Sequence, residues 1–133
     1  MKIIHLRDEA EVRKLTNDPN CLVVLDFSAK WCGPCKRLYP LYEKFASEFP
    51  TDRRDVAFCH IDVDEMEAFA QINKITSLPT MMFVKGDTVV ETFVGADFNK
   101  FKRVFSQCMD PSSASSAPSS SAPSQTSTKE TRS

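Results

Sequence analysis

The spacing of hydrophobic residues predicts an alternation of strands and helices along most of the chain. The apolar run at residues 21–27 predicts a buried strand, and apolar residues at helical spacing over 35–49 predict the helix that follows it. Pro40 lies inside that helical stretch, so we expect a kink there. Further strands are predicted at residues 2–6, 55–61, 80–84 and 88–94.

Acidic residues in front of the helical stretches predict where the other helices begin. Asp8, with Glu11 three residues later, forms a capping box for a helix that runs to about Asn17. Asp64 and Asp97 are the predicted caps of the third and fourth helices. The third helix carries Phe69 and Ile72 on one face, and the fourth carries Phe98, Phe101, Val104 and Phe105.

The order of these elements, β-α-β-α-β-α-β-β-α, predicts an α/β domain. Strands that alternate with helices pair in parallel through right-handed crossovers. The Gly86-Asp87 turn predicts a hairpin between the last two strands, and Gly95 ends the second of them. We therefore expect a mixed five-stranded sheet flanked by four helices.

The composition of the chain changes near Asp110. From Pro111 onward the chain is almost wholly Ser, Ala, Pro and Thr, without aromatic or branched aliphatic residues. Such a segment buries too little apolar surface to offset the entropy lost on ordering. The prediction is a compact domain at residues 1–109 and a disordered tail at residues 110–133.

Charge and hydropathy exclude several classes of protein. The 17 basic and 18 acidic residues nearly balance, without a long basic run, so nucleic acid is not an expected partner. No apolar stretch approaches the roughly 18 to 20 residues of a membrane helix. The N-terminus has a charge too soon after its short apolar run to be a signal peptide. We expect a soluble, cytoplasmic monomer.

The chain has five cysteines, and an odd number without a signal peptide argues against a disulfide framework. Cys21, Cys59 and Cys108 are scattered and are expected to act as small hydrophobic residues. Cys108, beside the tail, is the one expected to be most exposed, and a regulatory thiol there is a hypothesis.

The remaining two cysteines form the motif Trp31-Cys32-Gly33-Pro34-Cys35, at a predicted strand-to-helix junction. A thiolate on Cys32 is stabilised by the N–H groups of the helix N-terminus, which lower a thiol pKa from ~8.5 toward ~3.5–7.5. Cys32 is thus the candidate nucleophile that forms a mixed disulfide with a substrate. Cys35, expected to be buried one turn into the helix, would then attack Cys32 and release reduced substrate.

Two readings of this motif remain open at this point. Gly33 and Pro34 shape the loop, and a proline in the first helical turn costs no hydrogen bond. The alternative to redox chemistry is half of a zinc site. Zinc needs two more ligands at suitable spacing, and the other cysteines and histidines are scattered, so redox chemistry is favoured.

Three further residues are candidates for the same site. Asp26 interrupts the buried strand, where burial should raise its pKa, and it could accept a proton near Cys35; the alternative is an Asp at a strand edge that faces water. Trp31 is expected to be partly exposed as an apolar lip for substrate, the alternative being a core aromatic residue. Pro79 precedes a strand, where it either marks the start of the strand or forms a cis peptide bond.

Three segments together resemble the thioredoxin family over about residues 1–109. They are Asp26-Phe27-Ser28-Ala29-Lys30-Trp31-Cys32-Gly33-Pro34-Cys35-Lys36, Leu78-Pro79-Thr80 and Phe93-Val94-Gly95-Ala96. The resemblance implies the thioredoxin fold, with a cis Pro79 against the cysteine pair that disfavours metal. It also implies a buried acid, Asp26, below Cys35. The Leu78 backbone would pair with an extended substrate segment, and Trp31, Pro79, Gly95 and Ala96 would line a shallow groove.

The resemblance also implies a function. The chain would be a protein-disulfide reductase that binds no cofactor and receives electrons from NADPH through thioredoxin reductase. Its clients would include peroxiredoxins, ribonucleotide reductase and methionine sulfoxide reductases, in the cytoplasm and also in the nucleus. The alternatives are a redox-sensitive protein-binding module that uses the same groove and, ranked last, a disulfide oxidase or isomerase.

Some residues depart from family patterns. Bacterial members usually have Trp at the position of Ser28, whereas many animal members have Ser there. An animal-type thioredoxin is therefore expected. Phe58 stands where bacterial members often place a Lys near the buried acid, which removes one counter-charge. Ser77 stands where some vertebrate members have a regulatory cysteine.

Overall fold

The structure is a computed structural model that describes residues 1–110. From residue 111 onward the predicted tail lies outside the described residues, so the prediction for it is not tested. Residues 1–102 form one compact unit, and a second unit begins at Arg103 and contains the end of the last helix. The order of strands and helices is the predicted one.

The observed elements agree with the predicted ones to within a few residues. The strands are β1 (Ile4–Leu6), β2 (Leu22–Ser28), β3 (Val56–Asp62), β4 (Thr80–Lys85) and β5 (Thr88–Val94). The helices are α1 (Glu9–Thr16), α2 (Gly33–Ser47), α3 (Glu67–Ile72) and α4 (Phe98–Met109). The helix α2 starts two residues earlier than predicted and continues through Pro40. The kink at that proline stays a prediction.

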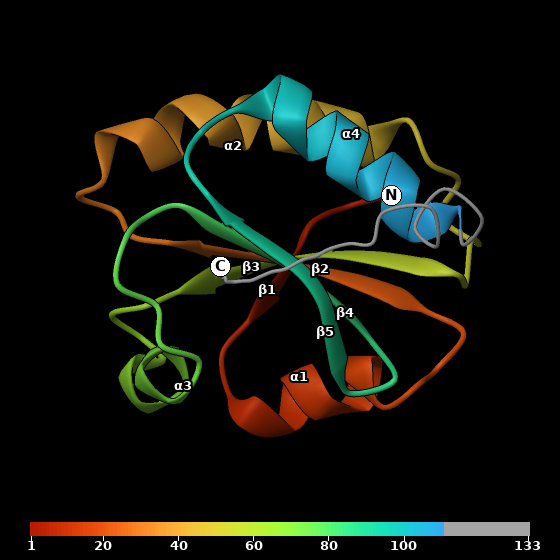
Figure 1. Ribbon diagram of the computed structural model, residues 1–133, viewed down its shortest axis with the longest axis horizontal. Helices are drawn as coiled ribbons and strands as arrows, with labels where there is room; N and C mark the ends of the chain where they lie inside the picture. The colour runs from red at the N-terminus through yellow and green to blue at the C-terminus, as the bar shows by residue number, and fades with distance from the viewer. Residues whose placement is uncertain (111–133) are drawn as a thin grey trace. The chain divides into compact units, whose positions relative to one another are not determined.

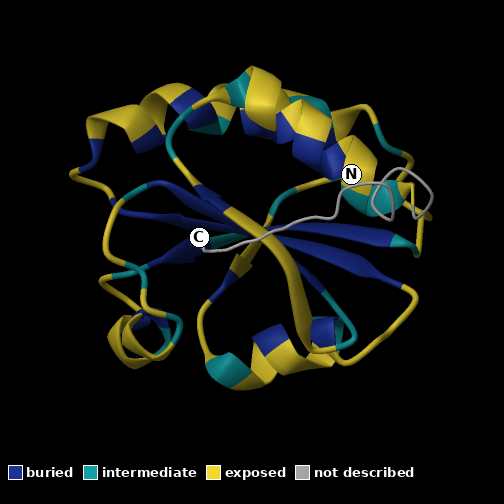
Figure 2. Cartoon of the chain, viewed as in Figure 1, coloured by how far each residue is buried: buried dark blue, intermediate teal, exposed yellow. Residues whose placement is uncertain are grey.

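The sheet is mixed, with the strand order β1-β3-β2-β4-β5. The strands β1, β3 and β2 pair in parallel, while β4 is antiparallel to β2 and to β5. This is the predicted mixed five-stranded sheet. The strand β2 lies in its centre, and all seven of its residues are buried, as Figure 2 shows in dark blue. A strand covered on both faces explains its continuous apolar run.

Helices cover both faces of the sheet. In Figure 1, α1 and α3 lie on one side and α2 on the other. On the α2 side, the buried Tyr42 packs edge-on against Phe58, and its hydroxyl donates a hydrogen bond to the Cys59 carbonyl at 2.8 Å. The ring of Phe101, in the first turn of α4, packs against Tyr42 and Phe83. Opposite, a second cluster includes Val12, Val23, Leu25, Phe27 and Ile61.

Two predicted helix caps are confirmed. The Asp8 carboxylate accepts a hydrogen bond from the Glu11 N–H at 2.9 Å, as a capping box requires. The Glu11 side chain reaches back to the Arg7 N–H, one residue before the cap. The Asp97 carboxylate accepts a hydrogen bond from the Lys100 N–H at 3.0 Å.

The predicted start of the third helix is wrong. The helix α3 begins at Glu67, and its cap Met66 makes no side-chain hydrogen bond to it. The prediction that Phe69 and Ile72 lie on one face of this helix is wrong too. Ile72 is 69% exposed, while Phe69 packs on the core. The buried stripe of this short helix runs along Met66, Phe69 and Ala70, which leaves Ile72 on the outer side.

The hairpin between β4 and β5 turns at Gly86 and Asp87, as predicted. Both residues have positive φ angles, +55° and +65°, as a type I′ turn requires. The Asp87 N–H donates to the Thr16 carbonyl at 2.8 Å, which ties the hairpin to the end of α1. Gly95, with φ +118°, ends β5. Within residues 1–110, none of the helices has the length and apolar character needed to span a membrane.

Candidate active site

The cysteine pair lies where the central strand β2 leads into α2. Cys32 is the N-cap residue of α2, and a disulfide joins it to Cys35. The Cys35 backbone N–H also points at the Cys32 sulfur and donates to it at 3.2 Å. Both cysteines are buried, with 6% and 3% of their surface exposed. The first sulfur therefore sits at a helix N-terminus, as the spacing predicted.

The two residues between the cysteines form the exposed first turn of the helix. Gly33 and Pro34 are the first two helical residues. The missing N–H of Pro34 costs nothing there, because the first N–H groups of a helix have no partner within it. The ring of the proline thus stiffens the loop without weakening α2.

A cis proline lies across from the helix start. The Leu78–Pro79 peptide bond is cis, and the Pro79 carbonyl accepts the Gly95 N–H at 2.9 Å. Leu78 packs against the small buried cluster formed by Ala29 and the two cysteines. The chain segments around residues 78–79 and 95 are therefore held together beside the disulfide.

A shallow surface depression next to these segments contains several predicted groove residues. Its lining includes Pro34, Leu78, Gly95 and Ala96. Trp31 and the buried Pro79 are not among its lining residues. The depression extends instead along α2 to Arg37 and to Leu41, which is 45% exposed.

Trp31 stands at the surface beside the motif. Its side chain is 70% exposed, so the reading as a core aromatic residue is wrong. Its indole Nε1–H donates a hydrogen bond to Asp64 Oδ2 at 2.9 Å. Asp64 is the residue predicted to cap α3, and it anchors this tryptophan instead.

Asp26 is the buried acid of the site. It is 2% exposed and lies in the central strand, so the strand-edge alternative is wrong. Burial raises the pKa of its carboxyl from the ordinary value to about 7. Among the described residues, its Oδ1 has no hydrogen-bond partner. Such an atom is free to hold or accept a proton.

Comparison with known proteins decides the family. The thioredoxin family model matches residues 2–107. The chain belongs to the thioredoxin family.

Relatives with this name come from distant organisms. Thioredoxin-2 of Saccharomyces cerevisiae is 40% identical over 95 residues, which cover 71% of this chain and 88% of the yeast protein. The thioredoxin of Ophiophagus hannah is 35% identical over 96 residues, 72% of this chain and 88% of that protein. The crystal structure of Malassezia sympodialis thioredoxin aligns with a TM-score of 0.72 and 35% identity, over 80% of this chain and 90% of the other. The thioredoxin fold and the predicted sheet are thus confirmed.

The family and the site together define the activity. Thioredoxins are protein-disulfide oxidoreductases that act with thioredoxin reductase and with disulfide-containing clients. This thioredoxin carries its CxxC pair as the Cys32–Cys35 disulfide. Its activity is therefore dithiol–disulfide exchange.

The sequence did not reveal which residue lies next to Asp26 in this thioredoxin. Phe58 is in register with Val24, while the residue of β3 beside Asp26 is His60. On the other side, Asp26 is in register with Met81 of β4. Strand order and register alone bring His60 here, and no local pattern signals it. By contrast, the spacing of Pro34, Arg37 and Leu41 at i, i+3 and i+7 could have indicated the α2 side of the depression.

The other cysteines lie away from the redox pair of this thioredoxin. Cys21 and Cys59 are buried in the apolar cluster on the α1 side, as predicted, and burial raises the pKa of both thiols. Cys108 is half-buried. Among residues 1–110, no group of three or more His, Cys, Asp and Glu side chains is placed to hold a metal ion.

Proposed function

We propose that this thioredoxin is a general protein-disulfide reductase, with Cys32 as its nucleophile. The supporting observation is the position of the Cys32 sulfur at the N-terminus of α2, where it accepts the Cys35 N–H at 3.2 Å. In the reduced protein the same N–H and the helix N-terminus stabilise a thiolate. That thiolate attacks one sulfur of the substrate disulfide, forms a mixed disulfide and releases the other sulfur as a thiolate.

Cys35 resolves the mixed disulfide. Its thiol gives its proton to the Asp26 carboxylate, and its sulfur then attacks Cys32. The Cys32–Cys35 disulfide forms, the bond between Cys32 and the substrate breaks, and the second substrate sulfur leaves as a thiolate that takes a proton from water. Two electrons pass to the substrate. The burial of Asp26 and its unpartnered Oδ1 support this role.

The substrate chain binds beside the cysteine pair. Leu78, Gly95 and Ala96 line the depression next to Pro34, which supports their role as groove residues. An extended substrate segment pairs with the Leu78 backbone, next to Pro79. The exposed Trp31, next to Cys32 in the chain, contributes an apolar contact.

The wider setting follows the resemblance. Electrons come from NADPH through thioredoxin reductase, and this thioredoxin itself binds no cofactor. Clients include peroxiredoxins, ribonucleotide reductase and methionine sulfoxide reductases, and the protein acts as a cytoplasmic and nuclear monomer. Ser28 supports an animal-type member. The thioredoxin domain spans residues 1–109, with a Ser-rich tail at residues 110–133.

The test is the reduction of insulin by NADPH and thioredoxin reductase. The wild-type protein should turn over, the Cys32→Ser variant should fall to background, and the control Cys108→Ser should keep its rate. The Cys35→Ser variant should trap many clients covalently through Cys32. Full turnover by Cys32→Ser would show that the mechanism is wrong. Retention of one partner without a covalent bond would favour a redox-sensitive binding module.

A further inference from the structure

A row of five residues crosses the sheet through Asp26. The strand registers place His5 of β1 beside His60 of β3, and His60 beside Asp26 of β2. The row continues to Met81 of β4 and Phe93 of β5. Residues in register on neighbouring strands leave the sheet on the same face, so these five side chains share one face.

The two halves of this row differ in chemistry. Toward β5, Met81 and Phe93 are buried apolar side chains that carry no proton. Toward β1, His60 is half-buried and His5 is exposed. Along this row, side chains that can bind and release a proton therefore lead from Asp26 to solvent in one direction only.

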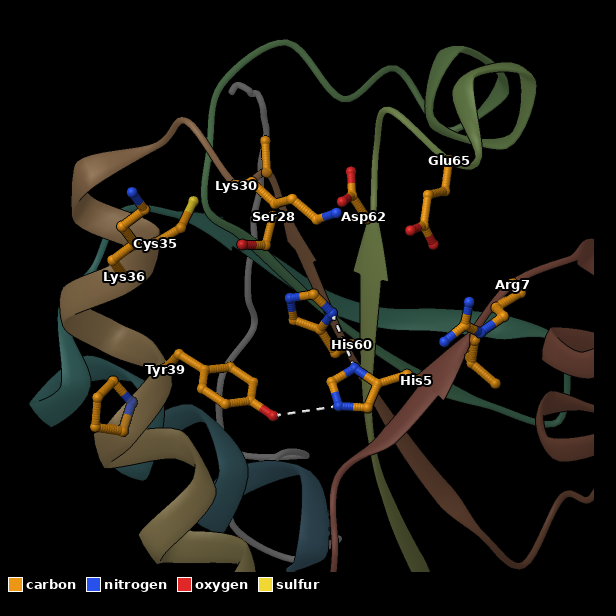
Figure 3. Close-up of a pocket in the computed structure, with 13 residues that line it drawn as sticks. His5, Arg7, Ser28, Lys30, Cys35, Lys36, Tyr39, His60, Asp62 and Glu65 are labelled. Atoms are coloured by element: carbon orange, nitrogen blue, oxygen red, sulfur yellow. Dashed lines mark hydrogen bonds between the residues drawn. The ribbon is translucent and has the colours of Figure 1, made fainter.

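The histidine side of the row opens into a cavity of about 620 Å³ (Figure 3). The Nδ1 atoms of His5 and His60 lie 3.4 Å apart, and the Tyr39 hydroxyl lies 3.4 Å from His5 Nε2. The cavity thus gives solvent access to the histidine pair. The resolving Cys35, on α2, lines the same cavity.

We propose that His60 and His5 carry protons between the buried Asp26 and solvent. This inference rests on the proposed role of Asp26 as the acceptor of the Cys35 proton. After that transfer, the Asp26 carboxyl gives its proton to an imidazole nitrogen of His60. His60 releases a proton from its other ring nitrogen to His5 or to water in the cavity. No electrons move in these steps, and Asp26 returns to the carboxylate.

Burial and neighbouring charges shift the pKa values of both partners in this transfer. Burial and the neighbouring His5 lower the pKa of His60, while Asp62 and Glu65 raise it. Burial raises the pKa of Asp26 to about 7.

The cavity has other ionisable side chains in its lining besides the two histidines. Burial, Glu43 and Asp26 raise the pKa of Tyr39, so its hydroxyl keeps its proton. The other charged side chains that line the cavity are Arg7, Lys30, Lys36, Asp62 and Glu65. The chain has two histidines, His5 and His60, so the effect of replacing either is not obscured by a further histidine.

The first measurement is the ionisation of Asp26, followed by its side-chain carboxyl carbon in NMR spectra of the oxidised protein. The disulfide removes the titration of Cys32 and Cys35 from these spectra. His60→Leu should raise the midpoint by about one pH unit, because the carboxylate loses a polar neighbour, and His60→Lys should lower it by a similar amount. The control Glu43→Gln changes an exposed α2 charge outside the row and should leave the midpoint in place.

The second measurement follows the proton route in chelator-treated protein. A chromogenic aromatic disulfide releases one coloured thiolate when Cys32 attacks it and a second when Cys35 resolves the adduct. At pH 6 most Asp26 carboxyls already hold a proton and must release it before they can accept the one from Cys35, so His60→Ala should slow the second phase about tenfold there and leave the first unchanged. Imidazole should restore the second phase from within the cavity, whereas its isomer pyrazole, which is not protonated near neutral pH, should not.

The outcomes separate this inference from the proposed function. The variant His5→Gln alters an exposed residue of the edge strand β1, so it should keep the fold and slow the second phase as well. A wild-type protein that releases no coloured thiolate would overturn the proposed function and this inference with it. Two normal phases in wild type, His60→Ala and His5→Gln alike would overturn this inference alone. An Asp26 midpoint that moves in neither His60 variant would overturn it as well.

Discussion

The indole N–H of Trp31 donates a hydrogen bond to Asp64 at 2.9 Å, across 33 positions of the sequence. Trp31 is 70% exposed, and this bond orients its side chain next to Cys32. Asp64 is available for it because α3 begins three residues later, at Glu67. The lip of the active site thus depends on a residue outside the motif.

Loss of this bond should weaken substrate binding. Asp64→Ala should lower kcat/KM for insulin reduction about fivefold, because a net hydrogen bond contributes about 1 kcal/mol. Asp64→Asn keeps an acceptor oxygen and is the matched control, with a rate near that of wild type. Fluorescence of Trp31, the only tryptophan in the chain, reports its changed environment directly. Equal rates for both variants would show that the bond has no role in substrate binding.

The buried Asp26 should make stability fall as pH rises. Its pKa is about 7 in the folded protein and ~3.9 when unfolded, so between these values the folded state binds more protons. Its contribution to the free energy of unfolding is therefore full below about pH 4 and is lost as pH rises toward 7. Above pH 7 the charged, buried carboxylate costs a few kcal/mol.

Asp26→Asn removes this dependence. Urea unfolding of the oxidised protein at pH 5 and pH 8 should show the variant more stable than wild type at pH 8, with a smaller difference between the two pH values. The control Asp52→Asn changes an exposed carboxylate and should keep the wild-type dependence. A wild-type protein with equal stability at both pH values contradicts the prediction.

The type I′ turn should depend on Gly86. An alanine there would adopt a positive φ, +55°, and its Cβ would lie 3.1 Å from the Pro19 Cα. Gly86→Ala should lower the free energy of unfolding by about 1–2 kcal/mol. Gly33→Ala is the comparison, because its Cβ would meet nothing nearer than Arg37 at 3.9 Å in a helical turn. Thermal or urea unfolding measures both, and equal losses would contradict this explanation.

Removal of the tail should leave the chemistry intact. The cysteine pair, the depression beside it and the cavity behind it all lie within residues 1–102. Deletion of residues 111–133 should therefore keep the rate of insulin reduction within error of the full chain. A large fall in the rate would assign the tail a part in substrate or reductase binding.

Local patterns in the sequence were enough for the elements and for the redox pair. The apolar run of β2 and the capping box at Asp8 act over a few residues, so each signals its element without knowledge of the rest of the chain. The same holds for Cys32, because its place at a helix start needs only the strand before it and the helix after it. The prediction that Asp64 caps the third helix failed because an acidic residue shortly before an apolar helix resembles an N-cap. Here the chain makes a turn after Asp64, before α3 begins at Glu67.

The sequence by itself determined the α/β order and the cysteine pair at a helix N-terminus, since both follow from spacing along the chain, while the family resemblance implied the buried Asp26. Only the tertiary structure decided which side chains surround them. The strand order β1-β3-β2 places His60 beside Asp26, and the packing of α2 brings Tyr39 over His5. Such neighbours are far apart in sequence, and their contact depends on the register of the whole sheet. The proton environment of Asp26 therefore becomes visible only in the folded molecule.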